Sequence, residues 1–205
     1  MITEKVLKPT AAFAMMLIQL IGFLVAGGGL LWTMINPSGW AAIFIILGII
    51  DVICLGGYAV VAPNQALVLT LFGKYIGTVK EAGFWWINPF TMRRTISLRI
   101  RNFESGKLKV NDHDGNPIEI GAIVVWQVVE TAEAIFNVEN YENFLQVQSE
   151  AAIRTLASSY PYDAHQEDVL SLRGNTDAVT EQLKKEIQER LTKAGVEVIE
   201  ARIAH

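Results

Sequence analysis

Three groups of polar residues in the sequence could do chemistry: a carboxylate inside an apolar run, an acidic turn, and a histidine with acidic neighbours. Asp51 is the only formally charged residue between Thr10 and Ala62. If this run crosses a membrane, an ionised carboxylate there costs about 2.5 to 3.5 kcal/mol or more. We consider two alternatives for Asp51: a contact with Gln19 of the preceding apolar run or with a neighbouring subunit, and a protonated carboxyl held between two helices.

The acidic turn contains Asp112, Asp114 and Asn116, which match the first three ligand positions of a calcium-binding EF-hand loop. The match fails further on, because Pro117 stands where that loop needs glycine and Ile123 where it needs the closing glutamate. The residues on either side have a strand pattern, whereas an EF-hand has helices there. We therefore predict a tight turn and no metal site.

The third group is His165 with Glu167 and Asp168, the densest cluster of polar groups in the sequence. A hydrolase would need a nucleophile beside this histidine, but no serine or cysteine motif and no glycine-rich phosphate loop is present. We expect a turn between two helices here, no catalytic residue and no cofactor. The only cysteine, Cys54, excludes an intrachain disulfide.

Two long apolar runs occupy the first third of the chain. Residues 13–35 and 40–61 are each long enough to cross the hydrocarbon core, which takes about 20 helical residues. Residues 36–39 contain Asn, Pro, Ser and Gly, so we predict a short turn between two transmembrane helices. Trp32 and Trp40 flank this turn, and indoles favour the interface between membrane and water.

Basic residues lie on both sides of the predicted helical hairpin, and its turn carries no charge. By the positive-inside rule, the N-terminal tail, residues 1–12, and the domain formed by residues 63–205 should both be cytoplasmic. The first apolar run is too long for the core of a cleaved signal peptide. The basic residues are Lys5 and Lys8 before the hairpin and Lys74, Lys80, Arg93 and Arg94 after it.

The remaining residues alternate between strand and helix patterns, which indicates an α+β domain with an antiparallel sheet and packed helices. The chain has 17 Lys and Arg against 21 Asp and Glu, a mild negative excess that gives nucleic acid no basic face to bind. We expect strands at residues 65–72, 75–79, 94–103, 106–110, 118–129 and 196–203, and helices at residues 141–158 and 172–191.

An aromatic cluster follows the second strand: Phe84, Trp85, Trp86 and Phe90. Aromatic rings partition well into the headgroup region of a membrane, so the cluster could form a loop that rests there. The alternative is a small core beneath the sheet. The sequence alone leaves both interpretations open.

The order of these parts resembles the SPFH family, which includes stomatin, prohibitin and flotillin and is also called Band 7. The resemblance covers about residues 60–205. It rests on the run Val61 to Val68, Phe72-Gly73-Lys74, Gly83, Asn88-Pro89-Phe90, the Asp114-Gly115 hairpin with the following strand, Glu150 to Leu156 with Arg154, and Gly195-Val196-Glu197-Val198.

The resemblance implies a scaffold without enzymatic activity that forms homo-oligomers on the membrane and organises lipid microdomains and membrane proteins. The alternative function is an adaptor that regulates a membrane protease or transporter through its hairpin, with Asp51 as a contact. Family members usually continue into a long coiled coil, whereas this sequence stops at His205. We expect either a longer natural chain or assembly through the domain and the hairpin.

The predicted topology can be tested by cysteine labelling of intact cells in a Cys54→Ala background. A cysteine in the turn, Ser38→Cys, should react with a membrane-impermeant maleimide from outside, because the turn lies across the membrane from both termini. Asn116→Cys, in the cytoplasmic domain, should react only after lysis. The reverse pattern would overturn the orientation.

Overall fold

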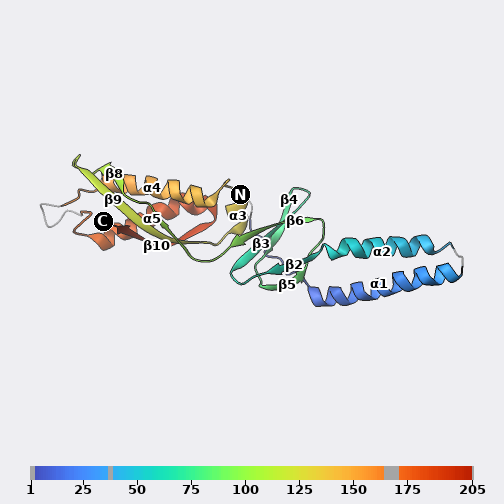
Figure 1. Ribbon diagram of the computed structural model, residues 1–205. Coiled ribbons are helices and arrows are strands. Elements are labelled where there is room, and N and C mark those ends of the chain that lie inside the picture. Colours follow the sequence, from blue (N-terminus) through green and yellow to red (C-terminus); the bar gives the residue numbers. More distant parts are fainter. Residues whose placement is uncertain (1–2, 37–38, 164–170, 205) are drawn as a thin grey trace. The chain divides into compact units, whose positions relative to one another are not determined.

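The structure is a computed structural model that describes residues 3–36, 39–163 and 171–204 (Figure 1). The chain divides into two compact units, Lys5–Ser97 and Leu98–His205 together with Met1–Glu4. We call them the N-terminal unit and the C-terminal unit. Part of the predicted turn, Pro37 and Ser38, lies outside the described residues, as does the cluster of His165, Glu167 and Asp168.

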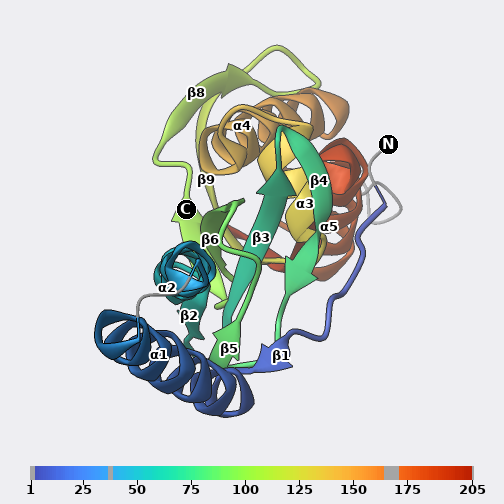
Figure 2. The ribbon, with the colours of Figure 1, turned by 90° about the vertical axis from the view of Figure 1, so that its right-hand side faces the viewer.

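Two apolar helices, α1 (Ala12–Ile35) and α2 (Ala41–Leu55), form the predicted hairpin and pack side by side (Figures 1 and 2). The prediction of a second helix as far as Val61 is wrong, because α2 ends at Leu55. The chain then turns at Gly56 and Gly57. A Cβ on Gly57 would lie 2.3 Å from the indole nitrogen of Trp86, so only glycine fits this close approach.

Two small antiparallel sheets complete the N-terminal unit. The first has the order β1 (Thr10–Ala11), β5 (Gly83–Trp86), β2 (Tyr58–Val61), and the second has the order β4 (Lys74–Val79), β3 (Gln65–Leu71), β6 (Thr91–Ser97). Their shared core consists of Val61, Leu67, Leu69, Val79 and Ile87. Because β2 leads into β3, the hairpin is connected directly to this core.

The C-terminal unit is an antiparallel sheet with packed helices, as predicted. The sheet has the order β10 (Val196–Ala204), β9 (Pro117–Val128), β7 (Arg101–Glu104), and β8 (Leu108–Asn111) also pairs with β9. The helices are α3 (Thr131–Phe136), α4 (Tyr141–Ser159), α5 (Thr176–Leu191) and the short 3-10 helix η1 (Thr192–Ala194). The apolar residues of α5, Val179, Leu183, Ile187 and Leu191, are spaced along one helix face and are fully buried.

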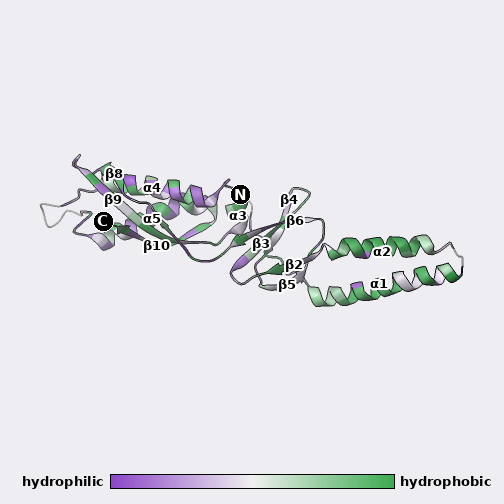
Figure 3. Ribbon diagram, in the orientation of Figure 1, coloured by the Kyte–Doolittle hydropathy of each residue, from purple (hydrophilic) through white to green (hydrophobic). Residues whose placement is uncertain are grey.

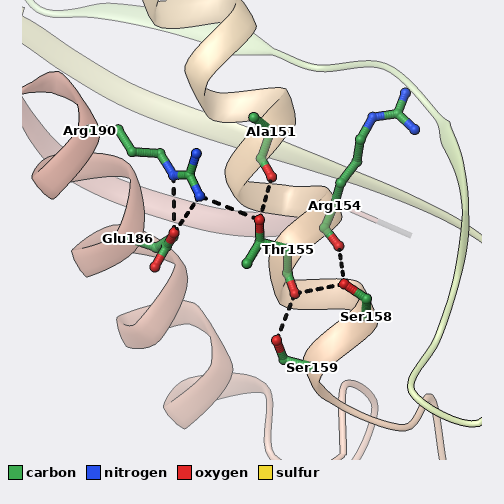
Figure 4. A network of polar contacts seen from close by, with 7 residues as sticks. All are labelled: Ala151, Arg154, Thr155, Ser158, Ser159, Glu186 and Arg190. Carbon is green, nitrogen blue, oxygen red and sulfur yellow. Dashed lines mark hydrogen bonds and ion pairs between the residues drawn. The ribbon is translucent and has the colours of Figure 1, made fainter.

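Helices α4 and α5 are also joined by a polar network (Figure 4). Arg190 of α5 forms an ion pair with Glu186, at 2.6 Å, and its guanidinium also donates to the hydroxyl of Thr155 on α4, at 3.4 Å. Arg154 contributes its carbonyl oxygen, which accepts from the hydroxyl of Ser158. The network lies at the surface of the unit, so its contribution to stability is modest.

Two other predictions in this region need correction. The predicted single strand at residues 94–103 is two strands, β6 and β7, in different sheets, because the chain passes from one unit to the other between Ser97 and Leu98. Ile96 is buried while Ile100 is exposed, so the alternation in sequence does not define one face. Leu172 is buried but precedes α5 rather than lying within it.

The acidic turn between β8 and β9 is organised around the carboxylate of Asp112. This carboxylate accepts from the backbone amides of Asn116 at 2.7 Å, Asp114 at 3.0 Å and Tyr162 at 3.1 Å, and from the side-chain amide of Asn116 at 3.2 Å. Burial favours the neutral acid, but these hydrogen bonds together outweigh burial and hold the pKa of Asp112 below its ordinary value of 3.8. The carboxylate therefore fixes the turn and ties it to the segment at Tyr162.

A lowered pKa makes the contribution of Asp112 dependent on pH. Because the folded state holds the proton less tightly than the unfolded chain, this contribution is present above the ordinary carboxyl pKa and is lost as the pH falls below about 4. Asp112→Asn should lower the melting temperature near neutral pH and flatten its dependence on acid pH, measured by circular dichroism in detergent. Asp114→Asn, which removes an exposed carboxyl beside His113, is the matched control and should keep the wild-type slope.

Candidate membrane-anchoring site

The residues of the helical hairpin are mostly apolar (Figure 3), and many of its large apolar side chains are exposed. Within the described part of the chain, α1 is the one helix long and apolar enough to cross a membrane by length and composition. Its 24 residues extend about 36 Å. Helix α2 is equally apolar, but its 15 residues extend only about 22 Å, less than the hydrocarbon thickness of about 30 Å.

Small residues let the two helices approach closely along one face of α1. A Cβ on Gly22 would lie 2.4 Å from a carboxylate oxygen of Asp51, and a Cβ on Gly29 would lie 2.3 Å from the ring of Phe44. Between them, the Cβ of Ala26 lies 3.9 Å from the Cβ position of Gly48. Residues 22, 26 and 29 are spaced four and three apart, so they share one helix face. We call this face the small-residue seam.

A polar cluster lies next to this seam, between the two helices. Gln19 is buried, and its amide donates to the backbone carbonyl of Asp51 at 3.4 Å, while the hydroxyl of Tyr58 donates to the Gln19 side-chain oxygen. The structure therefore brings Asp51 and Gln19 together, although through the Asp51 backbone rather than its carboxylate. Asp51 itself is only 9% exposed, and its Oδ2 has no hydrogen-bond partner among the residues described.

Both ends of the hairpin are attached to the same strand, β5. Thr10, just before α1, and Tyr58, just after α2, both pair with Trp86. The indole of Trp86 donates to the carbonyl of Cys54 at 3.0 Å. Arg93 donates to the carbonyls of Gly56, at 2.7 Å, and Tyr58, at 2.9 Å, which places a cation at the negative end of α2. Both ends of the hairpin are therefore fixed to one strand at the same residue.

The aromatic cluster at residues 84–90 does not behave as one group. Phe84, Trp85 and Trp86 are half-buried and form strand β5 rather than a loop. The ring of Phe84 stacks on Tyr58, with centroids 5.5 Å apart, and meets Phe13 edge-on at 5.9 Å. Phe90 is 60% exposed. The first three residues thus fit the small-core interpretation, while Phe90, like Trp32 and Trp40 near the turn, is free to meet lipid.

Two residues in this site have structural roles that their sequence patterns do not indicate. Arg93 was counted only for its charge, and Tyr58 was placed inside the second apolar run. The two consecutive glycines, Gly56 and Gly57, were the available signal that the helix ends before Tyr58, since glycine is common just beyond helix ends.

Comparison with known proteins agrees with this architecture. The family model described as "SPFH domain / Band 7 family" matches residues 59–205. The chain belongs to this family. It is also 24% identical over 165 residues to a stomatin homolog from Pyrococcus abyssi, an alignment that covers 80% of this chain and 59% of that relative. The chain thus spans less than two thirds of the length of the curated relative it matches.

The family match places the SPFH domain just after the hairpin. It begins at Ala59, so it includes most of β2 and all of β5 but neither helix. The hairpin offers an apolar surface for lipid, and both of its ends are attached to β5 of the N-terminal unit.

The small-residue seam can be tested by disulfide trapping. In a Cys54→Ala background, Ala26→Cys and Gly48→Cys should crosslink on mild oxidation, because their Cβ positions are 3.9 Å apart and disulfides need about 3.5 to 4.5 Å. Adding Gly22→Leu should abolish most of this crosslink, since the new side chain collides with Asp51. Gly28→Leu is the matched control, because nothing lies within 4 Å of its Cβ position. Equal crosslinking in both variants would contradict the seam.

Proposed function

We propose that this SPFH protein is a scaffold anchored by its hairpin, whose subunits form homo-oligomers on the membrane and organise lipid microdomains and membrane proteins. The observation that carries the proposal is the attachment of Thr10 and Tyr58 to the same residue of β5. A hairpin fixed at both ends cannot swing freely about one flexible linker. Each inserted hairpin would therefore hold its domain against the membrane surface.

We further propose that the two helices form two spans, with the N-terminus and the SPFH domain in the cytoplasm. The flanking basic residues support this orientation, and the common strand β5 supports placing both ends on one side. Helix α2, at about 22 Å, is shorter than the average hydrocarbon core. A short span is accommodated by local thinning of the bilayer.

Such thinning gives the scaffold a physical means of sorting lipids. The cost of a mismatch is a fraction of a kcal/mol per ångström, but it applies to every subunit of an assembly. An array of hairpins would therefore favour lipids of matching thickness over the whole area that it covers. This mechanism needs no binding pocket for a particular headgroup and no enzymatic step.

The adaptor alternative requires Asp51 to contact a membrane protease or transporter. The burial of Asp51 against Gly22 gives this alternative no specific support, because α1 already covers the carboxyl. A membrane protein partner would more readily meet the exposed apolar faces of α1 and α2. We accordingly keep the scaffold as the proposed function, with lipids and copies of the chain as its first partners.

The scaffold proposal predicts the state of the protein after mild extraction. In digitonin, mass photometry should show a large homo-oligomer that persists on dilution, because subunits of a scaffold bind one another without a client. The same membranes washed with alkaline carbonate should retain the protein, since the hairpin is buried in lipid. A particle of one or two chains that grows only when a client is added would favour the adaptor, and release by carbonate would contradict the anchor itself.

A further inference from the structure

The turn between β3 and β4 holds an aromatic side chain in an unfavourable backbone conformation. Leu71 pairs with Lys74, which leaves Phe72 and Gly73 as a two-residue turn, and their φ angles are +48° and +81°. Two-residue turns with both φ values positive strongly prefer Asn-Gly or Asp-Gly. Phenylalanine is a poor choice for the first position, because its Cβ opposes the left-handed conformation.

The side chain of Phe72 is also 87% exposed, so no core contact within the described chain compensates for this conformation. Two further apolar side chains are exposed at the same end of the sheet. Strand β6 begins at Thr91, which pairs with Leu71, the residue just before the turn. Phe90 and Met92 stand on either side of Thr91 in the chain, so both lie beside the turn. Met92 is 66% exposed. We call Phe72, Phe90 and Met92 the tip patch.

The tip patch lies at the base of the hairpin. The amide of Ile87 donates to the carbonyl of Gly57 at 2.8 Å, and the Cβ position of Gly56 lies 3.6 Å from Cβ of Pro89. Phe90 follows Pro89 directly in the chain. The loop that carries Phe90 therefore meets the C-terminal end of α2, where the apolar surface of the hairpin stops.

Two exposed basic residues accompany the patch. Lys74 follows the turn directly, and Arg94 is two residues after Met92 on the same face of β6, since side chains alternate along a strand. Apolar and aromatic side chains bordered by Lys and Arg are the composition of a surface that binds an anionic lipid interface. A covered protein core would not need these two cations beside it.

We propose that the tip patch inserts into the headgroup region of the leaflet from which the hairpin enters, with Phe72 deepest and with Lys74 and Arg94 on anionic headgroups. This inference rests on the proposed function, because it takes the hairpin to be in the bilayer. Phe72 then gives the N-terminal unit a contact with lipid that is separate from the hairpin. Two separated attachments fix the tilt of the β4-β3-β6 sheet relative to the membrane, which one hairpin alone does not.

The test places an environment-sensitive fluorophore on the full chain in vesicles of phosphatidylcholine and phosphatidylserine. In a Cys54→Ala background, Phe72→Cys labelled with the dye NBD should emit at shorter wavelength and should lose emission when lipids carry a shallow doxyl quencher. The matched control is Asn116→Cys, in the β8–β9 turn, which should keep the emission of a probe in water. Lys74→Gln combined with Arg94→Gln should reduce quenching at residue 72 and weaken its dependence on phosphatidylserine.

The outcomes separate this inference from the proposed function. If carbonate releases the chain from the vesicles, the anchor fails and the scaffold proposal fails with it. If the chain resists carbonate but the probe at residue 72 is neither shifted nor quenched, the tip patch does not meet lipid and the inference alone is overturned. A third outcome is a shifted emission without quenching, where the shift disappears at one chain per vesicle. A second copy of the chain would then cover Phe72, and the inference would again be overturned.

Discussion

The constraint on which the rest of the N-terminal unit depends is the pairing of one strand with the chain on both sides of the hairpin. Trp86 of β5 pairs with Thr10 and with Tyr58, and its indole also binds the last turn of α2. A hairpin of apolar helices that was joined to a sheet by a single linker could rotate relative to that sheet. Two linkers paired to the same residue remove that freedom.

Inside the hairpin, close packing of small residues joins the two helices, alongside the hydrogen bond from Gln19 to the backbone carbonyl of Asp51. In lipid, apolar side chains gain nothing from avoiding water, so helix contact depends on close packing of small residues. Gly22 and Gly29 provide this by accepting Asp51 and Phe44 where any Cβ would collide. The buried carboxyl of Asp51 therefore fills the space opposite Gly22, although its Oδ2 has no hydrogen-bond partner among the described residues.

Much of this architecture could be predicted from the sequence because its strongest signals are local. The apolar runs, the Asp114-Gly115 hairpin and the stripe of α5 each depend on periodicity within one segment. The end of α2 and the break between β6 and β7 could not be predicted in this way. Tyr58 to Val61 is apolar enough to continue a helix, and only its pairing with β5 makes it a strand. Likewise, Ile96 and Ile100 alternate correctly but belong to different units.

In the candidate site, too, composition indicates which residues are apolar, but only tertiary structure shows which of them are exposed. The aromatic composition left Trp85 and Trp86 open to either the membrane interface or a small core, and strand pairing half-buries both. Phe72 was expected at the end of a strand, because residues 65–72 have a strand pattern. Its importance depends on three facts that only coordinates supply: the positive φ, the exposure and the register with β6. An aromatic residue kept in a strained, exposed turn has no stabilising role within the unit, and this is why the surface that it meets must lie outside it.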